Sequence, residues 1–298
     1  MGCPKILVII VTYNGIRWIE RCLSSVKGHD LFIIDNGSTD GTQAFIRSRF
    51  PSALFRQSEK NLGFGRANNI GMKYAIDHDY DYVYLMNQDA WVMPGAIKEL
   101  VEVNKQHPEY GILSPMQMQD GLAYFDNIFG MKVLTWEASK RLIEDWYHGQ
   151  REDVYEVPFV MAAHWLVSAG CIKKAGLFSP TFPHYGEDDN YIDRARYHGF
   201  KTGVVPSAQA VHDRDNSPWN RKKQAYMSNY IIPLQKLSSI SNKVSPWPVI
   251  VKNAVTYSLI WRSFAPVTYL IRLLREYPAV RRNRDISKQP AAFVNYEW

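Results

Sequence analysis

The sequence predicts an α/β fold with a Rossmann-like, mostly parallel sheet flanked by helices, followed by a helical carboxyl-terminal extension. Short apolar runs alternate with stretches of helical periodicity between residues 5 and 101, and this alternation is typical of βαβ units. After residue 219, Lys, Arg and Pro interrupt the apolar segments, which favours helices over a continued sheet. We therefore expect a sheet domain over residues 1–218 and a helical, basic and aromatic extension over 219–298.

Hydrophobic periodicity predicts the elements of the sheet domain. Apolar runs of strand length indicate strands, and apolar residues three or four apart indicate the helices between them. In chain order, we expect strands at 5–11, 31–34, 53–55, 82–86, 202–206 and 208–212, and helices at 16–26, 44–50, 70–75 and 191–199, with another that begins at Pro94. Between residues 111 and 150 the pattern is irregular, with short apolar pieces separated by turns.

The composition limits the classes of partner. Lys and Arg number 35 against 29 Asp and Glu, a formal net charge of +6 that favours anionic neighbours such as nucleotide phosphates or lipid. The 3 Cys residues have no metal-like spacing, and no apolar run reaches the roughly 20 residues of a membrane span. We expect a cytoplasmic protein with no nucleic-acid partner, while contact with the inner face of the plasma membrane stays open.

Polar residues follow the first two predicted strands. Thr12, Tyr13 and Asn14 end the first, and Asp35 and Asn36 end the second. Parallel neighbours bring both ends to one edge of the sheet, where ligands bind in open α/β folds. A planar base could lie against the tyrosine while the carboxylate accepts a hydrogen bond from its ring N–H. The alternative for the second group is a plain turn.

A glycine-rich loop precedes the third predicted helix. Gly63 and Gly65 let the backbone approach a ligand closely, and Arg66 offers a forked cation. These features suit a phosphate, although glycines before helices are also common without any ligand. The third glycine of a dinucleotide-binding loop is replaced by Asn68, so that class of site is excluded.

Two further groups could carry chemistry. Asp89 follows the strand at 82–86 and could bind Mn²⁺ or Mg²⁺, with His212 as a second ligand, although a lone histidine is more often structural. Asp188 stands between two other acids at a predicted helix start. A carboxylate there could take a proton from an attacking hydroxyl, or the acids could simply cap the helix.

The order and spacing of six stretches resemble family 2 glycosyltransferases with the GT-A fold, in particular the bacterial rhamnosyltransferase-like branch. The stretches are VTYN at 11–14, IDNGSTDGT at 34–42, NLGFGRANNIG at 61–71, LMNQDA at 85–90, GED at 186–188 and VH at 211–212. Together they span roughly residues 5 to 215. Beyond Trp219 the resemblance fades.

The resemblance implies an inverting, metal-dependent transfer of a sugar from a nucleotide diphosphate donor to a hydroxyl of a saccharide or lipid-linked saccharide. dTDP-rhamnose is the favoured donor and UDP-linked sugars come next, in the synthesis of bacterial surface polysaccharide. The implied base is Asp188 and the implied metal ligands are Asp89 and His212. The implied donor contacts are Thr12, Tyr13, Asn14, Asp35, Asn36, Asn61, Gly63, Arg66, Asn69 and Asn87.

The family's usual D-x-D is Asn87-Gln88-Asp89 in this chain, which removes one carboxylate. Two alternatives to an active transferase stay open: a catalytically silent nucleotide-sugar-binding subunit, and a nucleotidyltransferase. For the extension, Arg residues among apolar and aromatic ones suit either an interfacial membrane contact or a packed helical cap, with a homodimer contact as a variant of the latter.

Overall fold

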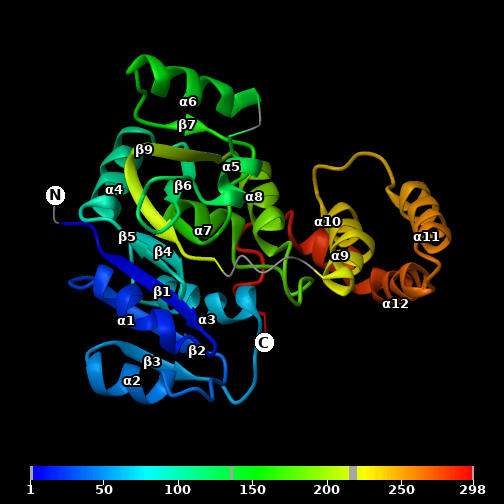
Figure 1. The fold of residues 1–298 in the computed structure, drawn as a ribbon, viewed down its shortest axis with the longest axis horizontal. Coiled ribbons are helices and arrows are strands. Elements are labelled where there is room, and N and C mark those ends of the chain that lie inside the picture. Colours follow the sequence, from blue (N-terminus) through cyan, green and yellow to red (C-terminus); the bar gives the residue numbers. More distant parts are fainter. Residues whose placement is uncertain (1–2, 135–136, 215–219, 297–298) are drawn as a thin grey trace.

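The structure is a computed structural model that describes residues 3–134, 137–214 and 220–296. In this part of the chain a nine-stranded sheet has the order β3-β2-β1-β4-β8-β6-β9-β5, and β7 also pairs with β9 (Figure 1). The strands are β1 (Ile6–Thr12), β2 (Asp30–Asp35), β3 (Leu54–Gln57), β4 (Tyr82–Asn87), β5 (Ala90–Val92), β6 (Tyr110–Met118), β7 (Tyr155–Glu156), β8 (His164–Ser168) and β9 (Lys201–His212).

The sheet is mostly parallel, as the sequence predicts. β1 is parallel to both β2 and β4, and β2 is parallel to β3. β8 lies between β4 and β6 and is antiparallel to both. β6 and its parallel partner β9 therefore run in the same direction as β4. The short strands β5 and β7 are antiparallel to β9.

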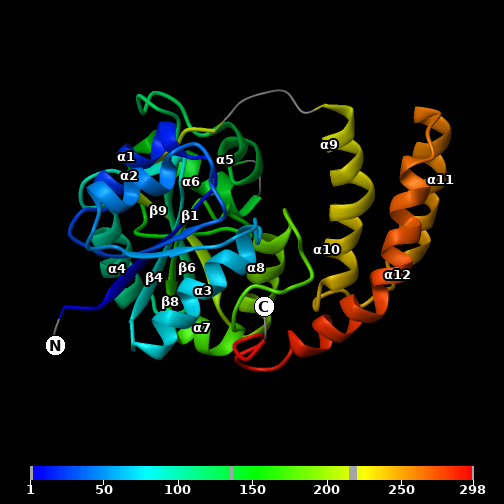
Figure 2. The same ribbon diagram turned by 90° about the horizontal axis from the view of Figure 1, so that it is seen from below.

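Helices cover both faces of the sheet (Figures 1 and 2). Alternation along β1 sends Leu7 and Ile9 to one core and Val8 and Ile10 to the other. The first core includes residues of α3, α7 and α8, and the second includes residues of α1, α2 and α4. Their bounds are α1 (Ile16–Ser25), α2 (Thr42–Arg49), α3 (Phe64–Asp77), α4 (Ala96–Gln106), α5 (Asn127–Lys132), α6 (Glu137–His148), α7 (Ala169–Ala175) and α8 (Glu187–Tyr197).

Four details differ from the sequence-based prediction. The third helix begins at Phe64, so most of the motif at 61–69 is already helical. α4 begins at Ala96 after a left-handed Gly95, and Pro94 precedes it. The irregular stretch at 111–150 contains most of the long strand β6 and both α5 and α6. The two strands expected at 202–206 and 208–212 form one strand, β9, with a register shift between its pairs Val205 and Gln209.

The chain continues into a helical extension with a core of its own. Helix α9 (Arg221–Tyr226), a π-helical turn η1 (Met227–Ile231) and α10 (Ile232–Ser238) follow without a break, and α11 (Trp247–Trp261) and α12 (Ala265–Ile286) form a hairpin beside them (Figure 2). Buried Tyr230, Leu234 and Leu273 pack there with Phe182 from the loop before α8. No helix in the described residues is long and apolar enough to cross a membrane.

The end of the chain returns to the sheet domain. The backbone N–H of Leu177 donates to the carbonyl of Ala292 at 2.9 Å, and that of Ala291 donates to Lys174 at 3.2 Å. Gly176 sits against this segment so closely that a Cβ there would lie 2.0 Å from the carbonyl oxygen of Ala292. Phe293 is buried in the same core as α8. The end of the extension is therefore attached to the sheet domain by hydrogen bonds and by packing.

Gly71 allows α3 to pack on β1, because a Cβ at this position would lie within 2.8 Å of the Ile9 side chain. We expect Gly71→Ala to destabilise the protein by about 1–3 kcal/mol, since overpacking outweighs the better helix propensity of alanine. Gly130→Ala in α5 is the matched control, because the nearest atom to its Cβ would be 4.0 Å away. Urea unfolding measures both, and equal stability of the two variants would contradict this account.

Candidate active site

The side chain of Gln88 joins the loops that follow β1 and β4. Its carboxamide oxygen accepts from the backbone N–H of Tyr13 at 2.8 Å, and its nitrogen donates to the carbonyl of Tyr13 at 3.0 Å. Gly15 makes room for this contact, because a Cβ there would lie 2.2 Å from the carboxamide oxygen. Gln88 is not among the site residues that the sequence predicts, and its only signal there is its place in the middle of the N-x-D motif.

Asp35 organises the loop after β2 from a buried position. Its carboxylate accepts hydrogen bonds from the hydroxyls of Thr12 and Ser38, the backbone N–H groups of Gly37 and Ser38, and the amide of Gln43. Both Asp35 and Thr12 are 0% exposed. In this structure both side chains are therefore covered by the loop that they hold, and a donor contact by either of them stays a prediction.

Asn14 and Asn36 fix the neighbouring turns. Asn14 has a left-handed backbone, its N–H donates to the hydroxyl of Ser38, and its side-chain oxygen accepts from the N–H of Thr39. The Asn36 side chain is buried and donates to the carbonyl of Gly63 at 3.3 Å, so it connects the second loop to the glycine-rich loop. Tyr13 is 47% exposed beside them and presents a ring to solvent.

The glycine-rich loop packs on the loop that precedes α8. Gly63 has φ +79°, and a Cβ there would lie 2.5 Å from the carbonyl oxygen of Pro183, so both conformation and space require glycine. The side-chain oxygen of Asn61 accepts from the N–H of Gly63 at 2.8 Å. The Arg66 side chain is exposed on the first turn of α3 and makes no hydrogen bond or ion pair with the part of the chain that the structure describes.

Asn69 lies away from this surface. It is 1% exposed, and its carboxamide donates to the carbonyl of Phe178 and accepts from the N–H of the same residue, at 2.9 and 2.8 Å. Because both ends of the amide bind the protein backbone, Asn69 satisfies the hydrogen-bonding groups of Phe178 in the buried segment between α7 and α8. The expectation that it lies along the donor is not supported by this position.

Asp89 and His212 meet where β5 pairs with β9. Ala90 lies opposite His212 in the antiparallel register, and the imidazole Nε2 is 3.4 Å from both Asp89 Oδ1 and Asn87 Nδ2. Burial opposes ionisation of Asp89, but the hydrogen bond and charge of His212 and the nearby Arg214 outweigh it and lower the carboxyl pKa. The predicted pair of metal ligands is thus brought together, with Asn87 beside it.

Asp89 and His212 could hold a divalent cation whose remaining ligands come from a bound phosphate and from water. No group of three or more His, Cys, Asp or Glu in the described ranges could hold a metal by itself. One carboxylate and one imidazole can serve when phosphate oxygens and water complete the shell, and the imidazole favours Mn²⁺ over Mg²⁺. His212 is 4% exposed and its Nδ1 is buried without a hydrogen-bond partner in the structure.

Three acids begin α8 after Gly186, which is left-handed. Burial, reinforced by the charge of Asp188, raises the pKa of Glu187 to about 8 and that of Asp189 to about 7. Burial also raises the pKa of Asp188, opposed by a hydrogen bond from the N–H of Asp189 and by the charge of Lys132. A carboxyl group with a raised pKa accepts protons more readily than a solvated one, as a general base requires.

The helical extension contacts these acids directly. The side chain of Gln235, from α10, donates to Asp189 Oδ2 at 2.7 Å. Asp193, one turn further along α8, accepts from the N–H of Ile240 at 2.9 Å. A Cβ at Gly186 would lie 3.0 Å from Gln235 Cγ, so the two segments are closely packed. No signal in the sequence relates Gln235 to the acids, because 46 residues separate it from Asp189.

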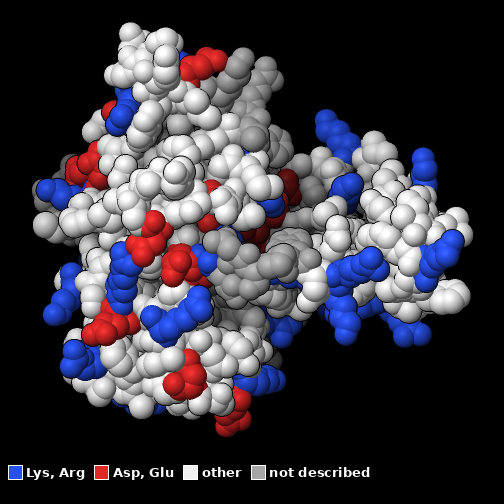
Figure 3. Space-filling model, in the orientation of Figure 1, with Lys and Arg blue, Asp and Glu red and all other residues white. Residues whose placement is uncertain are grey.

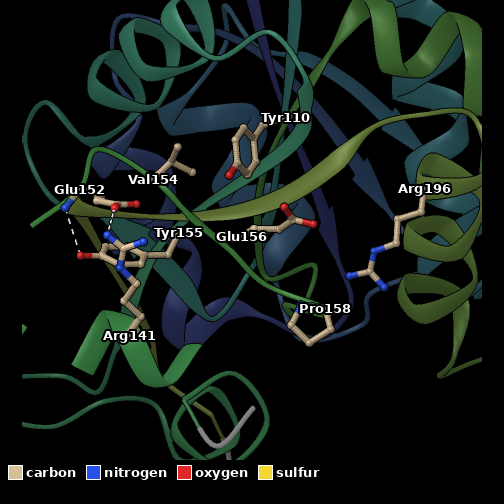
Figure 4. A pocket seen from close by; sticks show the side chains of 8 residues that line it. All are labelled: Tyr110, Arg141, Glu152, Val154, Tyr155, Glu156, Pro158 and Arg196. Atoms are coloured by element: carbon tan, nitrogen blue, oxygen red, sulfur yellow. Dashed lines mark hydrogen bonds and ion pairs between the residues drawn. The ribbon is translucent and has the colours of Figure 1, made fainter. Parts of the chain in front are cut away.

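A hollow of about 420 Å³ lies under α6 and β7, away from the predicted residues (Figure 4). Its lining residues are Tyr110, Arg141, Glu152, Val154, Tyr155, Glu156, Pro158 and Arg196. Arg141 forms an ion pair with Glu152 at its rim, so two of its charges neutralise each other. It shares no residue with the predicted site and we give it no catalytic role.

Sequence comparison decides the family. The profile described as glycosyl transferase family 2 matches residues 7–170, more than half of the chain. The chain belongs to this family. It is 26% identical over 234 residues to an N-acetylglucosaminyl-diphospho-decaprenol L-rhamnosyltransferase of Mycobacterium tuberculosis, an alignment that covers 70% of this chain and 76% of that protein. A low-salt glycan biosynthesis hexosyltransferase, Agl10 of Haloferax volcanii, is 22% identical over 225 residues, 74% of this chain and 71% of that one.

Solved structures support the GT-A fold. Residues 1–349 of TarS from S. aureus superpose with a TM-score of 0.58 at 13% identity, over 96% of this chain and 83% of that one. GalNAc-T7 in a structure with UDP, GalNAc and Mn²⁺ gives a TM-score of 0.56 at 15% identity, over 83% of this chain and 53% of that one. At these identities the likeness concerns the fold.

The raised pKa of Glu187 predicts a dependence of stability on pH. Its carboxyl stays protonated up to about pH 8 in the folded chain but ionises near its ordinary 4.5 when unfolded. The folded state therefore binds more protons in that window, and stability falls as pH rises through it. Glu187→Gln should leave the melting temperature unchanged near pH 4.5 and raise it by several degrees at pH 8.

The control for this prediction is Glu20→Gln, because Glu20 has a side chain that is 65% exposed. Its melting temperature should equal that of the unmodified protein both near pH 4.5 and at pH 8. The account of Glu187 fails if Glu187→Gln gives the same shift at pH 4.5 as at pH 8.

Proposed function

We propose that this family 2 glycosyltransferase is inverting and transfers a sugar from a nucleoside diphosphate donor to a hydroxyl of a saccharide or lipid-linked saccharide. The observation that carries the proposal is the close packing of α3 on α8. A Cβ at Gly65 would lie 3.7 Å from Glu187 Cβ and 3.1 Å from Phe178 Cβ. The acids therefore border the glycine-rich loop, which Asn36 connects to the loops at the carboxyl edge of the sheet.

The donor is proposed to lie over the loops at the ends of β1, β2 and β4. Tyr13 offers an exposed ring to the base, Asn14 is exposed next to it in the chain, and Asn61 is exposed on the glycine-rich loop. Arg66 supplies a cation for the phosphates. Asn87, at the end of β4, stands next to the pair formed by Asp89 and His212.

A divalent cation is proposed to bind Asp89 and His212, where it would neutralise charge on the departing diphosphate. The chain's own part in the reaction is assigned to Asp188. Its carboxylate removes the proton of the acceptor hydroxyl, whose oxygen forms a bond to the anomeric carbon while the bond from that carbon to the diphosphate breaks. The diphosphate leaves with the electron pair, and a single displacement inverts the configuration.

The relatives support a choice of substrates. The M. tuberculosis relative is an L-rhamnosyltransferase of N-acetylglucosaminyl-diphospho-decaprenol, and TarS has been solved in complex with UDP-GlcNAc. We propose dTDP-rhamnose as donor, with UDP-linked sugars second, and a role in bacterial surface polysaccharide at the cytoplasmic face of the plasma membrane. Mass analysis of products tests this, because a silent subunit would leave the donor intact and a nucleotidyltransferase would yield a nucleotide-bearing product.

Asp188→Asn should lower the rate of transfer by at least about 10²-fold while donor binding, measured by calorimetry, is retained, because the amide cannot accept the proton. Asp153→Asn is the control, since this side chain is 65% exposed far along the sequence from the acids. Turnover retained in Asp188→Asn would remove Asp188 as the base.

His212→Ala should weaken Mn²⁺-dependent binding of nucleoside diphosphate about tenfold or more, since one of two protein ligands is lost. His107→Ala serves as the control, because His107 lies 3.9 Å from Glu109 and Asp153 in a partly exposed group away from the loops. Calorimetry with and without Mn²⁺ measures both. Equal metal dependence in His212→Ala and the unmodified protein would make His212 a structural residue.

A further inference from the structure

The helical extension has an unusual charge distribution. Residues 221–275 contain nine of the 35 Lys and Arg and no Asp or Glu. The other 26 basic residues are outnumbered by the 29 acidic ones, so this segment alone makes the chain basic. In Figure 3 the outer part of the helical lobe shows Lys and Arg without Asp or Glu, whereas both signs are mixed over the sheet domain.

Large apolar side chains are exposed at the turn between α11 and α12. Leu259 is 75% exposed, Ile260 66% and Phe264 84%. Further along α11, Val251 and Val255 are exposed by 43% and 52%. Basic Lys252 and Arg262 stand among them and are exposed as well. A contiguous apolar surface of this kind usually marks an interaction site. We call residues 259–264 the hairpin tip.

A cavity of about 600 Å³ adjoins the hairpin tip. It is lined on one side by Arg221 and Lys222 at the start of α9 and on the other by Ile260, Trp261 and Tyr269. Neither Arg221 nor Lys222 forms an ion pair or side-chain hydrogen bond within the described ranges. Two cations facing an aromatic wall suit an anionic group that carries an apolar part.

We propose that the hairpin tip docks on an anionic lipid bilayer, with its apolar side chains in the interfacial region and a lipid phosphate in the adjoining cavity. Apolar residues at the tip supply hydrophobic attachment, and each nearby Lys or Arg adds electrostatic attraction to an anionic leaflet. A second copy of the chain is the less favourable occupant, because pairing two such tips would bring like charges together. The helices lie on the bilayer, since none in the described residues could cross it.

Docking at this place would connect the candidate site to the membrane through the extension. The start of α9 and the hairpin tip share one end of the extension (Figure 2). From the same extension Gln235 reaches Asp189, so the acids are connected to the docked unit. A lipid-linked acceptor would then diffuse in the plane of the surface that holds the enzyme. This last point rests on the proposed function, whereas docking itself does not.

Flotation of the full chain with vesicles tests docking without any catalysis. The unmodified protein should float with vesicles of phosphatidylglycerol and phosphatidylcholine at low salt, and float less with pure phosphatidylcholine or at high salt. The triple variant Leu259→Ser, Ile260→Ser, Phe264→Ser should lose at least about tenfold in the bound fraction. Arg221→Gln with Lys222→Gln should remove the preference for anionic vesicles while weaker attachment persists.

The matched control is Tyr124→Ser with Tyr147→Ser, two side chains exposed by 72% and 85% on the sheet domain. It should float like the unmodified protein. Circular dichroism and thermal melting check that the triple variant is folded. Docking is refuted if the unmodified chain stays with the unbound fraction at low salt, or if the triple variant floats normally. If flotation is absent and light scattering shows a dimer that the triple variant loses, the occupant of the hairpin tip is a second copy of the chain and docking on a bilayer is refuted.

Discussion

The antiparallel pairing of β5 with the end of β9 brings Asp89 and His212 together, although they are far apart in the chain. β9 must first pair with β6, change register near Val205, and then reach β5. Ala90 opposite His212 fixes which residue of β9 faces the N-x-D motif, and a slip of one residue would turn the imidazole to the other face of the sheet. The carboxylate and the imidazole are thus neighbours only when the whole sheet has formed.

Around this pair, many polar residues of the motifs bind the protein itself. Asp35 is occupied by loop donors, Asn36 by the glycine-rich loop, and Gln88 by the backbone of Tyr13. Because these contacts order the loops before a ligand binds, binding does not require the conformational entropy of the loops to be lost at that step. The exposed side chains, Tyr13 and Arg66 among them, are then held by a rigid frame.

The sequence predicts the parallel strands β1, β2 and β4 well, because these buried strands are continuous apolar runs. It divides β9 in two because Pro206 and Ser207 interrupt the run, and the register shift that accommodates them depends on β6. The sequence predicts that the third helix runs through residues 70–75 after the stretch at 61–69, but Asn69 already lies in α3 and is buried against the backbone of Phe178. A carboxylate such as Asp35 can be recognised from its position in a motif. Whether it faces a ligand or its own loop depends on hydrogen-bond donors, such as the Gln43 amide, that come near it only in the folded chain.

The return of residues 291–293 to Gly176 and Leu177 has a consequence for biosynthesis. The core of the sheet domain includes Phe293, so this core stays incomplete on the ribosome until residue 293 has been translated. A nascent chain that ends near residue 218 leaves the apolar surface beside α7 and α8 open, a surface that molecular chaperones recognise. The order of synthesis therefore places the helices of the extension between the strands of the sheet and the segment that completes its core, so the sheet domain and the extension finish folding together.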